Sequence, residues 1–276
     1  MSGRKLSASD RALRWLCAAA VLVPIAVLSS LLVSVALVGF TQLDAEVLAA
    51  VGGALRDSVY LGLLSAGLAV PLGVGAAIGL EQYGARATWA ELLDAKVAVL
   101  AGVPSVIYGL LGLELFARAL SSGRGLLAGA LTIALLVSPM IFVASREALR
   151  GVSASQREAG LALGGTRWQI VRHVVLPMAI PGIVSGTILA VARALGSAAP
   201  LLVLGGFAAA RVAPEAADPL AVLPVRIFSW IAGPAREGAG GNAAAGSFVL
   251  MVVCLGLHGL ALVIRGRSTG PREAEA

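Results

Sequence analysis

The stretch "SQREAGLALGGTRWQIVRHVVLPMAIPG", residues 155–182, is a charged, glycine-broken segment that leads directly into apolar sequence. It belongs to a chain of 276 residues in which 58% of the residues are hydrophobic and 13% are charged. A soluble domain usually has about 25% charged residues. A short polar segment in so apolar a chain indicates a loop that connects two membrane-spanning helices.

Apolar runs long enough to cross a bilayer, about 20 residues of helix, lie on both sides of this loop and elsewhere in the chain. Inside lipid the backbone must satisfy its own hydrogen bonds, and the runs lack the alternating pattern of a membrane barrel. We therefore predict an all-α, polytopic membrane protein with six transmembrane helices in a single domain, residues 1–276. The predicted spans are residues 15–40, 59–80, 97–116, 126–144, 178–203 and 248–264.

The basic residues indicate the side of the membrane on which each loop lies. Arg and Lys cluster near both ends of the chain and in the connection 145–177. Because cytoplasmic loops carry an excess of Lys and Arg, we expect both termini and this connection to be cytoplasmic. The longest connection, 205–247, is then expected outside. The first span, 15–40, is too long for a signal-peptide core, so we expect it to be retained.

Enzyme chemistry finds no support in the residue types present. Cys17 and Cys254 lie in apolar runs, and neither His173 nor His258 has a second ligand at metal-binding spacing. No G-x-x-x-x-G-K-[ST] motif occurs, so the chain encodes no phosphate-binding loop for ATP. We expect no catalytic residues, no metal site and no nucleic-acid binding.

The inner connection contains signals for two short helices. Ser153 and Gln156 have the spacing of a capping box, which predicts a helix from Ala154 to Leu163 that ends at Gly164 and Gly165. Thr166 and Gln169 repeat the spacing and predict a second short helix. Helices this short need a surface to cover them. That surface is either the lipid headgroups or a groove in a partner protein, and the small, uncharged face of "EAGLAL" favours the groove.

These residues resemble the EAA loop of the permeases of ABC importers. The resemblance is carried by Glu158, Ala159, Gly160 and Gly164, and by the later "VVLP" at 174–177. In that family the loop forms a coupling helix that docks in a cleft of a cytoplasmic ATPase. The resemblance implies a type I ABC importer permease fold, with ATPase-coupling residues at Glu158, Ala159, Gly160, Gly164, Thr166 and Arg167.

Further stretches resemble the PstA-type permeases of phosphate-specific ABC importers. They are "PLGVGAAIGLEQY" at 71–83, "AGVPSVIYGLLG" at 101–112 and "AVLPVRIFSW" at 221–230, within a permease core of about residues 55–265. The resemblance implies a prokaryotic cytoplasmic (inner) membrane protein that transports phosphate. It also implies a PstC-type permease as heterodimer partner, two copies of an ATPase that bind ATP and Mg²⁺, and an extracytoplasmic phosphate-binding protein.

Arg193 is the main candidate for the transport pathway. A cation within a span faces a partner or a watery cavity rather than lipid, and no acidic residue lies within two helical turns. The PstA pattern is Arg-Ala-x-Gly-Glu-Thr-Ala-Pro, whereas this chain has Ser197 in place of the glutamate. We expect Ser197 to line the path as a neutral hydrogen-bonding group. Ser105 and Tyr108, three residues apart, are weaker pathway candidates.

Two alternatives remain open at this point. The missing glutamate leaves room for another oxyanion, such as molybdate, tungstate or sulfate. A secondary transporter or channel that works without ATP is the alternative from a different class, and it has no need of a groove-docking helix.

Overall fold

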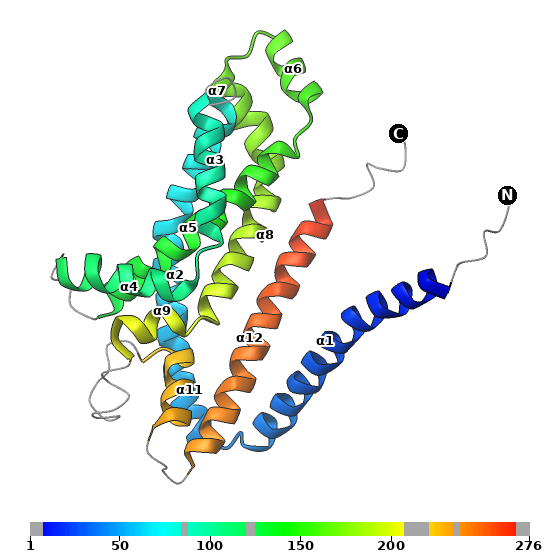
Figure 1. Ribbon diagram of the computed structural model, residues 1–276. Helices are drawn as coiled ribbons and strands as arrows, with labels where there is room; N and C mark the ends of the chain where they lie inside the picture. The colour runs from blue at the N-terminus through cyan, green and yellow to red at the C-terminus, as the bar shows by residue number, and fades with distance from the viewer. Residues whose placement is uncertain (1–7, 84–87, 120–124, 207–220, 234–237, 269–276) are drawn as a thin grey trace.

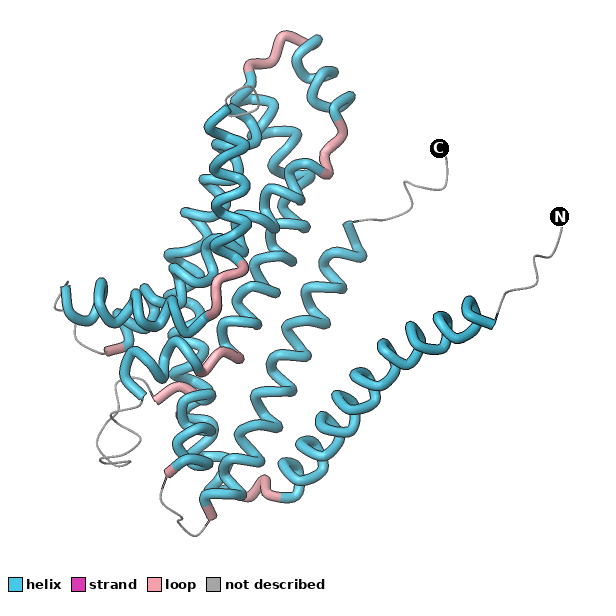
Figure 2. Tube along the Cα trace, in the orientation of Figure 1, coloured by secondary structure: helices cyan, strands magenta, loops and turns pink. Residues whose placement is uncertain are grey.

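The computed structural model describes residues 8–83, 88–119, 125–206, 221–233 and 238–268, and within these ranges every regular element is helical (Figures 1 and 2). In chain order the elements are α1 (Ala8–Thr41), α2 (Ala45–Tyr83), α3 (Thr88–Ala101), α4 (Ser105–Gly112), η1 (Leu113–Ala119), α5 (Leu126–Arg150), α6 (Ala154–Ala162), α7 (Arg167–Ile170), η2 (Val171–Val175), α8 (Leu176–Leu195), α9 (Ala199–Leu201), η3 (Leu202–Gly206), α11 (Leu223–Ala232) and α12 (Ala239–Ser268). The three η segments are π-helical.

Within the described ranges, five stretches of continuous helix are long and apolar enough to cross a membrane: 13–41, 45–82, 126–150, 167–195 and 239–267. The predicted third span, 97–116, is wrong as a single straight helix. The chain bends by 96° between α3 and α4, so six spans result only if this bent pair is counted as one. Pro104 explains the break, because proline lacks a backbone N–H and disfavours helical geometry at the residue before it.

The predicted fifth span, 178–203, also ends earlier than expected. Helix α8 stops at Leu195, and Gly196 caps it by donating its N–H to Ala192 O at 3.2 Å. The chain then continues as the short α9 and η3. Part of the long outer connection, predicted at 205–247, is helical as α11, and its residues 207–220 and 234–237 lie outside the described part.

Helix α5 lies at the centre of the bundle and packs on both α2 and α8. The contact between α5 and α8 depends on small residues: a Cβ at Gly186 would lie 2.5 Å from Ala144 Cβ, and one at Gly182 would lie 2.7 Å from Ala148 Cβ. A Cβ at Gly73 of α2 would lie 2.9 Å from a side-chain carbon of Ile141. The two helices that flank the inner loop, α5 and α8, are therefore held in close contact.

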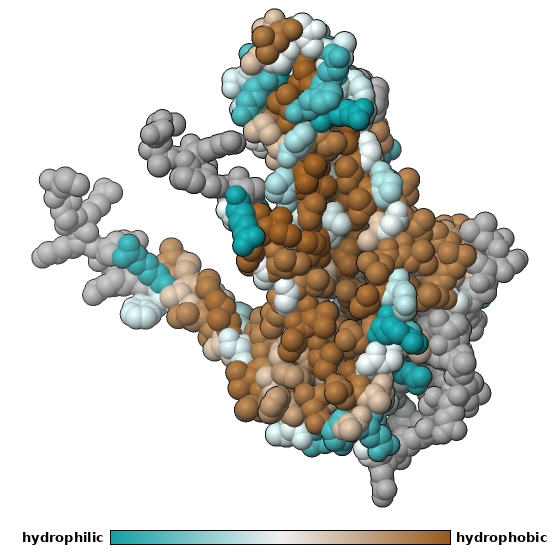
Figure 3. Space-filling model, turned by 180° about the vertical axis from the view of Figure 1, so that it is seen from behind, coloured by the Kyte–Doolittle hydropathy of each residue, from teal (hydrophilic) through white to brown (hydrophobic). Residues whose placement is uncertain are grey.

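Helix α1 extends away from the bundle, and among the described residues its main contact is with α12, near its own C-terminal end (Figure 1). There Phe40 and Phe248 meet edge to face, with ring centroids 6.2 Å apart. Along most of α1 the large apolar side chains are exposed, and Figure 3 shows apolar surface over the middle of the molecule. A surface of this kind suits a hydrocarbon solvent. The terminal residues 1–7 and 269–276, on which the predicted orientation partly rests, lie outside the described part.

Candidate functional site

The inner loop projects from the end of the bundle as α6 and α7, between the end of α5 and the start of α8 (Figure 1). The expected helix, Ala154 to Leu163, is confirmed as α6 to within one residue. Its expected start signal is wrong. Ser153 has the extended backbone of an N-cap but makes no capping hydrogen bond, and its Oγ lies 3.2 Å from Ser155 Oγ instead.

The expected end of α6 is confirmed in detail. Gly164 has φ +83°, a left-handed conformation that glycine adopts without steric cost. Its N–H donates to Leu161 O at 2.9 Å, and the N–H of Gly165 donates to Gly160 O at 3.2 Å. These two bonds form the Schellman motif, which satisfies carbonyls at the end of the helix and turns the chain sharply.

The start of α7 is the capping box predicted at Thr166. Gln169 N–H donates to Thr166 Oγ1 at 3.3 Å, and Thr166 N–H donates to Gln169 Oε1 at 2.8 Å. Gly160 of α6 packs against the buried side chain of Ile170 of α7. A Cβ at Gly160 would lie 3.0 Å from Ile170 Cγ1. Glycine at this position, where the EAA pattern usually has alanine, therefore allows α6 and α7 to approach closely.

The outer face of the loop is uncovered. Helix α6 has no buried residue, and the side chains of Leu161 and Leu163 are 49% and 89% exposed. Glu158, Ala159 and Arg167 are exposed as well. The loop therefore presents a rigid helix with an apolar, small-residue face and charged residues around it.

A group of charged residues beneath the loop had escaped the sequence-based prediction. Glu81, near the end of α2, accepts from Arg146 Nε at 3.2 Å and from Arg150 Nε at 3.1 Å. Asp94 of α3 contacts Arg146 Nη1, and its Oδ2 lies 3.8 Å from Arg150 Nη2. The sequence signal was the pair of arginines four apart at the end of α5, but it does not identify their partners.

Arg157 ties α6 to the helix ends at this same level. Its Nη2 donates to Leu149 O of α5 at 2.5 Å, and its Nη1 donates to Gln82 Oε1 of α2 at 3.4 Å. The inner loop is thus connected to α2 and α5 by side-chain hydrogen bonds as well as by the chain itself.

The proposed pathway residue Arg193 lies in the last turn of α8, two residues before the helix ends, and is exposed. No ion pair of Arg193 occurs among the described residues. Ser197 is half-buried and follows the end of the helix, where its N–H donates to Ala194 O at 3.0 Å. The predicted span 178–203 would place residues 193 and 197 one helical turn apart on a continuous helix, and this placement is wrong because α8 ends at Leu195.

Ser105 and Tyr108 both lie on α4, as predicted, and α4 packs on α9 next to Ser197. A Cβ at Gly109 would lie 2.7 Å from Pro200 O, so the approach is close. Tyr108 is only 4% exposed, and its hydroxyl donates to Leu100 O at 2.7 Å. That geometry gives Tyr108 a packing role, while Ser105 is half-buried at the first position of α4.

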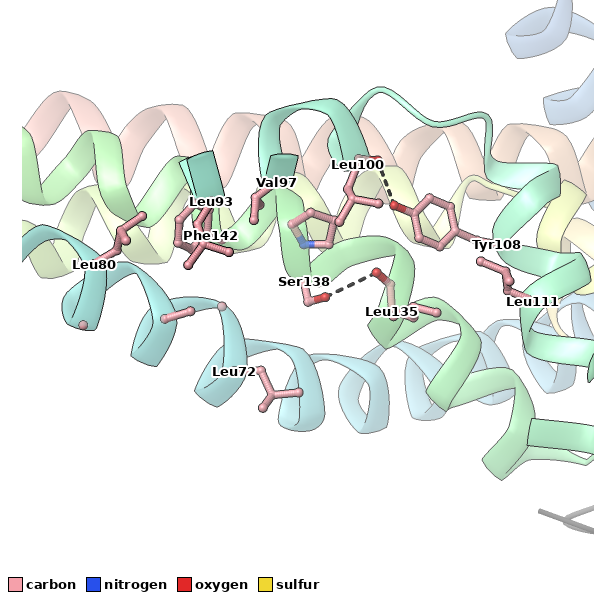
Figure 4. Close-up of a pocket in the computed structure, with 14 residues that line it drawn as sticks. Leu72, Leu80, Leu93, Val97, Leu100, Tyr108, Leu111, Leu135, Ser138 and Phe142 are labelled. Carbon is pink, nitrogen blue, oxygen red and sulfur yellow. Dashed lines mark hydrogen bonds between the residues drawn. The ribbon is translucent and has the colours of Figure 1, made fainter. Parts of the chain in front are cut away.

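Tyr108 also lines a cavity of about 550 Å³ between α2, α3, α4 and α5 (Figure 4). Apart from Tyr108 and Ser138 its lining side chains are apolar. The Ser138 hydroxyl donates to Leu135 O at 3.3 Å, so both hydroxyls have partners on the protein. This cavity has no charged group with which to bind an anion.

Comparison with known proteins places this geometry in a family. The family model "Binding-protein-dependent transport system inner membrane component" matches residues 69–267. The phosphate transport system permease protein PstA 1 of Mycobacterium tuberculosis is 36% identical over 190 residues, which are 67% of this chain and 62% of that protein. PstA of Yersinia pestis is 32% identical over 219 residues, 78% of this chain and 73% of that protein.

A solved structure agrees on the fold. The MetNI methionine ABC transporter superposes with a TM-score of 0.66 at 17% identity, covering 81% of this chain and 99% of that one. The relatives are named as permeases, and the apolar helices are those of a multi-pass membrane protein. The chain spans less than two thirds of the length of the M. tuberculosis relative. It belongs to the family of binding-protein-dependent transport system inner membrane components.

Proposed function

We propose that this chain is the transmembrane permease subunit of an ABC importer that carries inorganic phosphate across the cytoplasmic membrane. The observation that carries the proposal is α6, a helix that ends in a Schellman motif, has no buried residue and is anchored between two closely packed spans. A nine-residue helix of this kind is marginal in isolation and is stabilised when a partner covers it. The names of the PstA relatives support phosphate as the substrate.

The partner that covers α6 is a cytoplasmic ATPase subunit, which binds ATP and Mg²⁺. Closure of an ATPase pair moves the coupling helix, and α5 and α8 transmit the movement to the bundle. A PstC-type permease completes the heterodimer, and an extracytoplasmic binding protein delivers phosphate. Both termini are then cytoplasmic, and α12 runs towards the end of the bundle that carries α6 (Figure 1).

Arg193 is the residue through which the chain attracts the anion. Its guanidinium offers several N–H donors in the geometry that oxyanions accept, and no carboxylate neutralises it among the described residues. Ser197 follows it as a neutral hydrogen-bonding group. Because serine stands where PstA proteins have glutamate, transport of another oxyanion, such as molybdate, tungstate or sulfate, is the second candidate function.

The test is reconstitution of the full complex in liposomes, with the binding protein loaded with phosphate, molybdate or sulfate in turn. Phosphate is expected to stimulate ATP hydrolysis and to enter the vesicles only when ATP is present. Phosphate uptake at the same rate with and without ATP would refute the proposal. Stimulation of ATP hydrolysis by molybdate or sulfate, but not by phosphate, would identify that oxyanion as the substrate instead.

Substitutions test the assignment of Arg193. Arg193→Ala is expected to lower uptake about tenfold or more, the value of a hydrogen bond to a charged group, and Arg193→Lys less. Arg118→Ala is the matched control, because that arginine is exposed and paired with Glu114 on its own turn. Loss of uptake in Ser197→Glu together with normal uptake in Arg193→Ala would show the pathway assignment to be wrong.

A further inference from the structure

Helix α3 is attached to the bundle by charges as well as by apolar contacts. Among the described residues its principal neighbour is α5, and Val97 packs against a buried cluster there, whereas Leu92 and Val99 are more than half exposed. Asp94 joins α3 to Arg146 and Arg150 of α5. The polar part of the attachment of α3 to α5 thus consists of one carboxylate and two guanidinium groups.

The cluster of Glu81, Asp94, Arg146 and Arg150, here called the four-charge cluster, is internally neutral and partly buried. The side chains of Arg146 and Glu81 are 11% and 17% exposed, whereas Asp94 and Arg150 are 38% and 52% exposed. Each arginine lies between a carboxylate of α2 and a carboxylate of α3. Removal of one carboxylate leaves a partly desolvated cation without its counterion, which is costly, whereas the intact cluster is balanced.

The coupling helix contacts the chain neighbours of two residues of this cluster. Arg157 of α6 bonds Gln82, which is next to Glu81, and Leu149 O, which is next to Arg150. A displacement of α6 therefore acts on the two helix ends that carry three of the four charges.

The other end of α3 leads towards the proposed pathway. After the 96° bend the chain continues as α4, whose Gly109 lies against Pro200, three residues beyond Ser197. Movement of α3 relative to α5 is passed to α4, and α4 cannot shift without pressing on the segment that follows Arg193. This sequence of contacts connects the inner loop to the pathway by a route separate from α8.

We propose that the four-charge cluster, tied to α6 by Arg157, is the joint that makes α3 and α4 follow the coupling helix, with Asp94 as its key positioning residue. The inference rests on the proposed function, since it assigns a role within energy coupling. Asp94 touches neither the anion nor the ATPase in this scheme. It acts by making α3 move with α5.

The experiment measures phosphate uptake and ATP hydrolysis in the same liposomes, using the full complex with its binding protein. Asp94→Asn removes the charge and keeps the shape. It is expected to lower the phosphate moved per ATP hydrolysed about tenfold, within the usual range of coupling between sites. Hydrolysis stimulated by the binding protein is expected to persist. Glu114→Gln is the matched control, because it also removes a carboxylate paired with an arginine, here an exposed pair away from the loop.

The ratio of phosphate moved to ATP hydrolysed distinguishes a role of Asp94 in coupling from a role in the stability of the fold alone. A variant that is partly unfolded loses uptake and hydrolysis in equal proportion, which leaves the ratio unchanged and would overturn the proposal. Asp94→Glu is the conservative variant, because it keeps a carboxylate facing Arg146 and Arg150. It is expected to keep at least half of the unsubstituted ratio, and a loss as large as that of Asp94→Asn would also overturn the proposal. Failure of the proposed function is distinct, because unsubstituted complex would then show no ATP-dependent uptake.

Discussion

The substitution Gly164→Ala tests the claim that the geometry of the loop, rather than its composition, engages the ATPase. Gly164 has φ +83°, and an L-residue in this region costs about 1–2 kcal/mol. Alanine also lowers the conformational entropy of the unfolded loop, which stabilises the folded loop by less than about 1 kcal/mol. The net loss is on the order of 1 kcal/mol, which is about fivefold in the population of the docking-competent loop.

Nothing nearby offsets this loss. A Cβ at Gly164 has no neighbour within 4 Å and gains no packing, and α6 buries no side chain that holds it in place. The affinity of the ATPase for the permease complex in nanodiscs is therefore expected to fall about fivefold. The thermal unfolding midpoint of the membrane bundle is expected to stay constant. Asparagine tolerates left-handed geometry better than alanine, so Gly164→Asn should lose less affinity.

Gly151→Ala is the control, because Gly151 borders the same loop at φ −65°, where alanine is unstrained. Wild-type affinity in Gly164→Ala would refute the reasoning. So would an equal loss of affinity in Gly151→Ala, since that result would assign the effect to the loss of any glycine from the loop.

Three further substitutions probe the bundle and the loop. Gly186→Val should separate α8 from Ala144 and destabilise the protein by about 1–3 kcal/mol, seen as a lower midpoint in thermal unfolding that Ala144→Gly partly restores. Thr166→Ala removes the capping acceptor, at a cost of about 1 kcal/mol, and should speed hydrogen exchange in α7 but not in α8. Ser58→Ala leaves the buried first N–H of α11 without its acceptor and should cost about 1–3 kcal/mol, whereas the control Ser65→Ala, whose hydroxyl bonds only its own helix, should cost less.

The features that the sequence predicted most accurately are those determined by interactions between residues close together in the chain. Apolar runs identified the long helices because the bilayer requires a fixed length of apolar helix. The glycines at 164 and 165 predicted the end of α6, and Thr166 with Gln169 predicted the start of α7, because each signal and its hydrogen bonds lie within one turn. Ser153 shows the limit of such rules, since its hydroxyl pairs with Ser155 and leaves the cap unmade.

Features that depend on distant contacts were not predictable in the same way. The bend at Pro104 interrupts what the sequence predicted as one span, 97–116, and beyond it α4 packs on α9, where Gly109 meets Pro200. The two arginines at the end of α5 were visible in the sequence. Their carboxylates come from residues 81 and 94, and only the packing of α2 and α3 beside α5 brings them together.

The position of Arg193 affects how strongly the absence of the glutamate at residue 197 argues against phosphate as the substrate. In a continuous helix a carboxylate at 197 would stand beside Arg193 and neutralise it, so its absence would alter the charge of the pathway. Because α8 ends at Leu195, that spacing does not apply. The arginine instead lies in the last turn of α8, where the carbonyl end of the helix dipole stabilises a cation. Residue 197 lies two positions before α9, which packs on α4, and the influence of its side chain on the anion depends on how that segment moves. Serine at this position therefore argues less strongly against phosphate than the spacing in the sequence suggests, and the oxyanion specificity of the binding protein becomes the more decisive measurement.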